Sequence, residues 1–262
     1  RATGAEIVMN EATRAGFPHR PVKDGDAITF GKVRGVIVTT PGHTPDGTCL
    51  YVYSPAAERN PGMILTGEDL AKAPNATGVV LEFPAETELQ WIARMLPKEK
   101  RIAVLFNSGE NQSRIEEASR AAKSLGLTLE LRKLESPKDL PAALESLASQ
   151  ADVLWGIADP VVLNPQTAQP ILLFSLRNRI PFVGLSLTWV KAGALYALDR
   201  DYDDIGMQCG ELALRILQGK PAGTLPPTVP RKAVYSGNLK TARQLKVDIP
   251  RDLLKGAQSV IE

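Results

Sequence analysis

The sequence predicts an α/β fold, with a lobe built on a mainly parallel sheet over about residues 74–262 and a β-rich segment before it over residues 1–73. Two patterns carry this prediction. From residue 101 onward, short apolar segments alternate with segments of helical periodicity, which is typical of parallel strands joined by helices. Before residue 74, short apolar segments are separated by turn residues, which indicates a meander of short strands.

The composition is that of a globular protein. The chain has 262 residues, of which 44% are hydrophobic, enough for one large domain or two modest ones. Lys and Arg number 31 against 29 Asp and Glu, and the basic residues form no run beside aromatic residues, so nucleic acid is not an expected partner. Cys49 and Cys209 lie in apolar segments, and we expect buried free thiols there in preference to a disulfide.

Neither a membrane span nor a signal peptide is expected in the given chain. No apolar run approaches the ~20 residues that a bilayer-crossing helix needs. The sequence begins at Arg1 without the charged and apolar regions of a signal peptide.

The first segment contains short candidate strands over residues 6–9, 27–30, 33–40, 47–53 and 63–65. Gly31 and Lys32 separate the second strand from the third, so these two are expected to pair as a hairpin. Residues 23–26 and 40–47 are rich in turn-forming residues and are expected to be loops.

The second segment contains candidate strands over residues 101–106, 127–134, 152–157, 180–185 and 194–198. Helices are expected over about residues 115–125, 137–149, from near 164, and over 205–216. Ser136, Pro137 and Asp139 form a helix-start signature, while Pro170 delays or kinks the helix in which it lies. Residues 107–113 and 186–189 are expected to be loops, and residues 221–230 a proline-rich connector.

Those loops predict where a ligand binds, because ligands of open parallel sheets collect at the carboxyl ends of the strands. The predicted ligand contacts are Asn107, Ser108, Asn111, Gln112, Asp159, Ser186 and Trp189. Neutral donors and acceptors dominate this set, and it contains neither a nucleophile with a nearby base nor a phosphate-binding loop. Binding without catalysis therefore suits this chemistry.

Each of these residues also has a structural interpretation that the sequence leaves open. Asp159 precedes Pro160 and is equally suited to capping a turn. Asn107 and Asn111 are equally suited to the loop and the helix cap. Trp155 is expected in the core, whereas Trp189 is a candidate for lining a pocket or for packing.

Part of the first segment resembles the metallo-β-lactamase superfamily, nearest to its persulfide dioxygenase and glyoxalase-like members. The motifs are residues 17–26 (Phe-Pro-His-Arg-Pro-Val-Lys-Asp-Gly-Asp), 40–45 (Thr-Pro-Gly-His-Thr-Pro) and 64–67 (Ile-Leu-Thr-Gly). The resemblance implies a metal-ligand role for His43. The His-x-His-x-Asp-His motif of that superfamily is missing, and Glu68 stands where it has Asp, with Asp69 one position later. We therefore expect no metal and no cofactor, with His43 a turn residue.

The second segment resembles the ABC transporter substrate-binding family that includes tryptophan- and tyrosine-type binders. The resemblance rests on seven pieces in order, at residues 75–79, 101–107, 180–184, 193–195, 202–206, 217–221 and 238–242. It implies a type I periplasmic-binding fold of two hinged lobes, a small amino-acid-like ligand, no enzymatic activity, an ABC permease as partner and a periplasmic location.

The two resemblances together predict a fusion in which residues 1–73 stand where the family has its first lobe. A fusion with an incomplete first lobe is favoured over a single divergent domain. The alternative function is a metal-dependent hydrolase or sulfur dioxygenase carried by His43.

Overall fold

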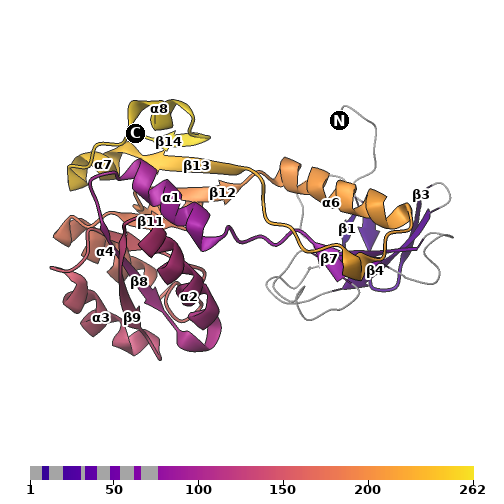
Figure 1. Ribbon diagram of the computed structural model, residues 1–262, viewed down its shortest axis with the longest axis horizontal. Helices are drawn as coiled ribbons and strands as arrows, with labels where there is room; N and C mark the ends of the chain where they lie inside the picture. The colour runs from indigo at the N-terminus through magenta and orange to yellow at the C-terminus, as the bar shows by residue number, and fades with distance from the viewer. Residues whose placement is uncertain (1–7, 12–19, 31–32, 40–47, 54–61, 66–75) are drawn as a thin grey trace. The chain divides into compact units, whose positions relative to one another are not determined.

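The structure, a computed structural model, describes residues 8–11, 20–30, 33–39, 48–53, 62–65 and 76–262 (Figure 1). Contacts within the chain divide it into two compact units, the first of residues 1–82 and 202–231 and the second of residues 83–201 and 232–262. The chain therefore passes from one unit to the other three times. The boundary at residues 73 and 74 drawn from the sequence stays a prediction.

The first unit contains a five-stranded sheet in the order β3-β4-β5-β6-β7. Its strands are β3 (Ala27–Phe30), β4 (Val33–Thr39), β5 (Thr48–Tyr53), β6 (Gly62–Leu65) and β7 (Ala76–Gly78). Pairing is antiparallel from β3 to β6 and parallel between β6 and β7. The predicted hairpin of the second and third strands is confirmed by the pairing of β3 with β4. A separate parallel pair joins β1 (Val8–Asn10) to β2 (Arg20–Val22).

A late segment of the chain completes this unit. Helix α6 (Tyr202–Leu217) contacts β6 and β7, and the short helix η3 (Ala222–Thr224) contacts β7. Later in the chain, Thr228 forms an isolated β-bridge with Val79, and its backbone amide donates to the carbonyl oxygen of Gly78 at 2.9 Å. Leu212 and Ile216 of α6 are buried in a small core with Val79. The predicted helix over residues 205–216 is thus confirmed.

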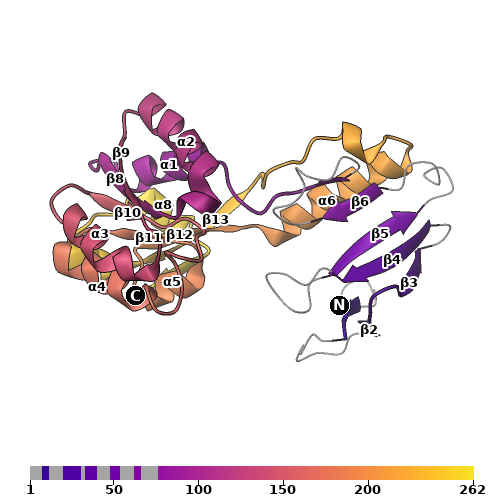
Figure 2. The same cartoon turned by 90° about the horizontal axis from the view of Figure 1, so that it is seen from below.

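The second unit is built on a seven-stranded sheet in the order β14-β13-β12-β11-β10-β8-β9 (Figure 2). Its strands are β8 (Arg101–Phe106), β9 (Thr128–Lys133), β10 (Val153–Trp155), β11 (Phe182–Gly184), β12 (Tyr196–Arg200), β13 (Ala233–Asn238) and β14 (Ser259–Ile261). All neighbours pair in parallel except β12 and β13, which are antiparallel. The mainly parallel sheet that the sequence predicts is confirmed.

Helices connect these strands. They are α1 (Ala85–Met95), α2 (Ser108–Ser124), the 3-10 turn η2 (Pro137–Asp139), α3 (Leu140–Leu147), α4 (Ala168–Asn178), α5 (Leu187–Ala192), α7 (Leu239–Leu245) and α8 (Arg251–Lys255). The helix start predicted at Ser136 is confirmed, with a capping box to Asp139. The helix that contains Pro170 begins only at Ala168, so its predicted late start is confirmed.

The strands of the second unit bury side chains on both faces. In β8, Ile102 and Val104 join a core with α1 and α2, while Ala103 and Leu105 join a second core with α3 and α4. This alternation follows from the two-residue repeat of a strand. A sheet covered on both sides leaves the ends of its strands as the place for a site.

Two expected loops are helices in the structure. Residues 108–113 form the first turns of α2, because the Asn107 side chain accepts from the amide of Gly109 at 3.0 Å and caps the helix. Residues 187–189 begin α5 directly after Ser186, which is its N-cap residue but makes no side-chain cap hydrogen bond. Polar residues in the first turn of a helix resemble a loop in sequence, which explains both errors.

Gly156, directly after β10, has no room for a side chain. A Cβ there would lie 2.9 Å from the Phe182 ring and 2.9 Å from the Val183 carbonyl oxygen. We predict that Gly156→Ala lowers the free energy of unfolding by about 1–3 kcal/mol through overpacking. Gly237→Ala in β13 is the control, since a Cβ at Gly237 meets nothing within 4 Å. Urea unfolding of both variants tests this, and equal stabilities would contradict it.

Candidate functional site

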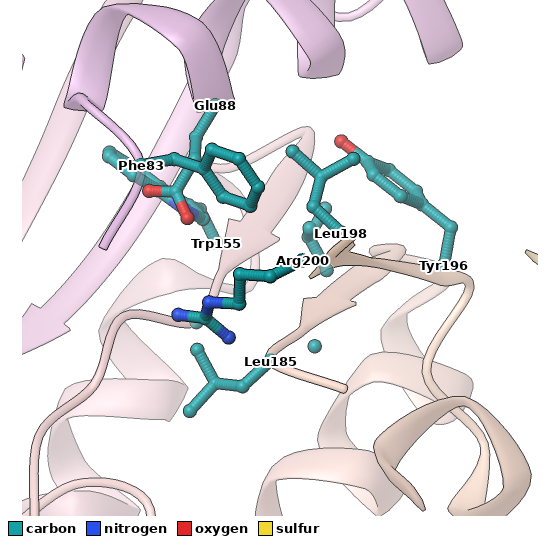
Figure 3. A pocket seen from close by; sticks show the side chains of 10 residues that line it. Phe83, Glu88, Trp155, Leu185, Tyr196, Leu198 and Arg200 are labelled. Carbon is teal, nitrogen blue, oxygen red and sulfur yellow. The ribbon is translucent and has the colours of Figure 1, made fainter. Parts of the chain in front are cut away.

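A recess opens on the second unit at the carboxyl ends of β10, β11 and β12 (Figure 3). The space in it that water can occupy is about 20 Å³. The lining residues are Phe83, Glu88, Trp155, Gly156, Val183, Gly184, Leu185, Tyr196, Leu198 and Arg200. Parallel strands that end side by side produce such a depression, and the sequence analysis placed the site at this type of edge.

Aromatic and aliphatic groups form most of the wall. Trp155 is the last residue of β10 and Phe83 precedes α1, and their side chains are 2% and 3% exposed. Leu185 directly follows β11, and Leu198 lies in the middle of β12. Gly156 presents only backbone to the recess. Rings and aliphatic groups of this kind suit an apolar or aromatic part of a ligand.

Two charged groups accompany this apolar wall. Arg200 ends β12, and its guanidinium carbon lies 5.7 Å from the centre of the Phe83 ring. Glu88, in the first turn of α1, pairs with Arg114 of α2. A guanidinium and a carboxylate at one recess are complementary to a ligand that carries charges of both signs.

Arg114 holds three lining residues in place. Besides its pairing with Glu88, it donates to the carbonyl oxygen of Phe83 at 3.3 Å. Its guanidinium carbon also lies 6.0 Å from the centre of the Trp155 ring. The side chains of Arg114 and Glu88 are 13% and 17% exposed, so the pair is largely shielded from water and links α1 to α2.

Three of the predicted contacts, Asn107, Asn111 and Asp159, lie together and hydrogen-bond to one another. Asp159 is 3% exposed. Its carboxylate accepts from the backbone amide of Asn107 at 2.6 Å and from Asn111 Nδ2 at 2.9 Å. Its other oxygen accepts from the amides of Val161 and Val162. The structure thus shows the turn-capping role that the sequence left open, and ligand contact by these residues stays a prediction.

The remaining predicted contacts lie on helices. Gln112 donates to Glu116 at 2.9 Å on the exposed side of α2, and Ser108 is the first residue of that helix. Ser186 is the N-cap residue of α5. Trp189 packs edge-on against Phe182, with ring centres 5.5 Å apart, beside the second core. Their roles toward a ligand stay predictions, and the recess is lined by other side chains.

Sequence reasoning missed Phe83, Glu88, Tyr196 and Arg200 as site residues. Tyr196 and Arg200 carried a usable signal, because every second residue of a strand points to the same face and both flank Leu198 on β12. Glu88 belongs to a helix that was not predicted, although Leu89, Ile92 and Met95 give it a helical period, and Phe83 lies just before that helix. Trp155 was correctly predicted to be buried.

The metal-site prediction falls outside what the structure describes. His19, His43, Glu68 and Asp69 are not among the described residues. Within the described residues, no group of three or more His, Cys, Asp or Glu side chains is placed to hold a metal.

The described helices include none with the length and hydropathy to cross a membrane. Cys209 is a free, half-buried thiol, and burial raises its pKa.

Comparisons with known proteins agree on one family. A family model described as "ABC transporter substrate binding protein" matches residues 62–261. A tyrosine-binding protein of Clostridioides difficile (strain R20291) is 28% identical over 157 residues, which cover 59% of this chain and 45% of that protein. The chain therefore matches less than half of that relative.

Solved structures give the same result for the fold. The ABC domain from Streptococcus pneumonia in complex with L-Trp is 25% identical with a TM-score of 0.55, covering 71% of this chain and 65% of that one. A ligand-free, open substrate-binding protein with adhesive properties from Clostridium difficile has a TM-score of 0.61 at 18% identity, covering 76% and 70%. The second likeness concerns the fold alone.

The four hydrogen bonds to Asp159 predict a structural role that can be measured. We expect Asp159→Asn to lower the free energy of unfolding by about 1–3 kcal/mol, because an amide NH₂ would face a donor where the carboxylate now accepts. Asp203→Asn, on the exposed first turn of α6, is the control and should change the stability by less than about 1 kcal/mol. Urea unfolding distinguishes the two, and an unaffected Asp159 variant would contradict the role.

Proposed function

The chain belongs to the ABC transporter substrate-binding protein family, and from this premise we propose that it binds an aromatic amino acid without transforming it. The recess of the second unit is the proposed site. Delivery of the ligand to an ABC permease, a location outside the cytoplasm and closure about a hinge are part of the proposal, because they follow from the family.

The observation that carries the proposal is the chemistry of the recess. Phe83 and Trp155 offer an apolar and aromatic surface for a ring, and Arg200 offers a guanidinium for a carboxylate. Glu88 accepts from Arg114, and a carboxylate has further lone pairs with which to accept from an ammonium. An α-amino acid with an aromatic side chain carries these three groups.

The relatives support the same ligand class. One is named for binding tyrosine and another was solved with L-Trp bound, and both of these ligands are aromatic amino acids. The lining of the recess holds no nucleophile beside a base, which supports binding in preference to catalysis. Asn107, Asn111 and Asp159 would then act by fixing the loops at the ends of β8 and β10.

The second interpretation, a metal-dependent hydrolase or sulfur dioxygenase carried by His43, has no described contact in its favour. The resemblance of residues 1–73 to the metallo-β-lactamase superfamily and the fusion with an incomplete first lobe stay predictions. The family match begins at residue 62 and overlaps the last part of that segment. This overlap favours a first unit that is partly inherited from the binding family.

Calorimetry tests the proposed ligand class. We expect the folded chain to bind L-tyrosine or L-tryptophan, and Arg200→Gln to weaken the affinity by about 10- to 100-fold because a charge-assisted hydrogen bond is lost. Arg177→Gln, on the exposed side of α4, is the matched control and should bind as the wild type does. No binding of either amino acid by folded protein would contradict the proposal.

Metal analysis tests the second interpretation independently. We expect fewer than about 0.1 zinc or iron ions per chain in purified protein, because a working site holds its metal tightly at neutral pH. Stoichiometric metal that His43→Ala removes would contradict this expectation and favour the hydrolase. His19→Ala serves as the matched control for loss of a histidine.

A further inference from the structure

Tyr196 has a buried hydroxyl with which no side chain or backbone group in the described part of the chain pairs. Its side chain is 1% exposed and lines the recess, and among the residues that the structure describes its hydroxyl has no hydrogen-bond partner. In Figure 3 the hydroxyl is the end of the side chain nearer to Glu88 and Phe83. Buried hydroxyls without a partner are rare in proteins because each costs free energy, so this one requires an explanation.

The hydroxyl can act as both donor and acceptor. Burial raises the pKa of Tyr196 well above its ordinary value, and the negative charge of Glu88 raises it further, so the phenol keeps its proton at neutral pH. A neutral phenol donates one hydrogen bond and accepts others. It can therefore pair with the hydroxyl of a phenol ring or with the N–H of an indole ring.

We propose that Tyr196 is a specificity-determining residue, whose hydroxyl selects an amino acid with a polar atom on its aromatic ring over one with a plain ring. This inference rests on the proposed function and deepens it. With the ligand carboxylate toward Arg200 and its ring against Phe83 and Trp155, the end of the ring would point toward Tyr196.

The physical basis is the cost of an unpaired polar group. A site that hydrogen-bonds a substrate hydroxyl or N–H rejects the analogue that lacks it, because the buried protein group is left without a partner. With phenylalanine bound, the Tyr196 hydroxyl would still lack a hydrogen-bond partner. Tyrosine or tryptophan would give the hydroxyl its partner, and the gain would appear as a preference.

The wild-type protein provides the first test. We expect calorimetric titrations of the full chain to give at least about tenfold tighter binding for L-tyrosine or L-tryptophan than for L-phenylalanine. Equal affinities for the three amino acids would overturn the inference and leave the proposed function standing. If none of the three binds, the proposed function fails, and the inference fails with it.

The variant Tyr196→Phe provides the second test. It should reduce the affinity for the preferred amino acid by about tenfold and leave that for L-phenylalanine unchanged or improved. Tyr235→Phe is the matched control, because Tyr235 is also buried and donates to the Leu253 carbonyl at 2.5 Å, away from the recess. It should keep the wild-type preference.

Three outcomes separate the possibilities. Loss of the preference in Tyr196→Phe alone supports the inference. An equal loss of affinity for all three amino acids in Tyr196→Phe overturns it, because Tyr196 would then stabilise the recess without distinguishing polar from apolar ligand rings. If Tyr196→Phe fails to fold, as judged by circular dichroism, the wild-type comparison with L-phenylalanine decides.

Discussion

The recess depends on the anchoring of α1 by Arg114. The guanidinium of this residue donates to the Phe83 carbonyl and pairs with Glu88, and it lies over the Trp155 ring. Glu117 of the same helix accepts from the Ala85 amide at 3.2 Å, so α2 holds α1 through two side chains. Removing one partner of such a shielded ion pair costs about 3–5 kcal/mol, so this pair contributes to holding α1 against α2.

The order of the strands supplies the other side of the recess. Neighbouring parallel strands end at the same edge, and β10, β11 and β12 place Trp155, Gly184 and Arg200 there. Gly184 has no room for a side chain, because a Cβ would lie 2.6 Å from the Cβ of Trp189 in α5. Tight packing of α5 against β11 thus coincides with a wall that is partly bare backbone. A glycine at position 184 leaves space in the recess that a larger side chain would fill.

Much of the second unit could be predicted from the sequence, and the reasons are physical. The apolar run over residues 101–106 predicts β8 with its observed bounds, because buried parallel strands are continuously apolar. The first turns of α2 and the whole of α5 were missed, because residues such as Ser108 and Ser186 are equally common in loops. The recess lies at the type of sheet edge where the sequence predicts a site, but none of the seven predicted contacts is among the residues that line it.

The reason lies in how buried polar groups are satisfied. Asp159 and Asn111 are buried, and the hydrogen bonds that their side chains need are made within the protein. The sequence shows where polar residues occur, but it does not show which partner each side chain hydrogen-bonds. The strand was expected to end at Leu198, whereas β12 continues for two more residues and so places Arg200 beside the recess.

The most direct test of the central claim is a crystal structure of the full chain with bound L-tyrosine or L-tryptophan. The account predicts the ligand ring against Phe83 and Trp155, with its carboxylate within hydrogen-bonding distance of the Arg200 guanidinium. A ligand that touches none of these three side chains, or that lies among Asn107, Asn111 and Asp159, would contradict it.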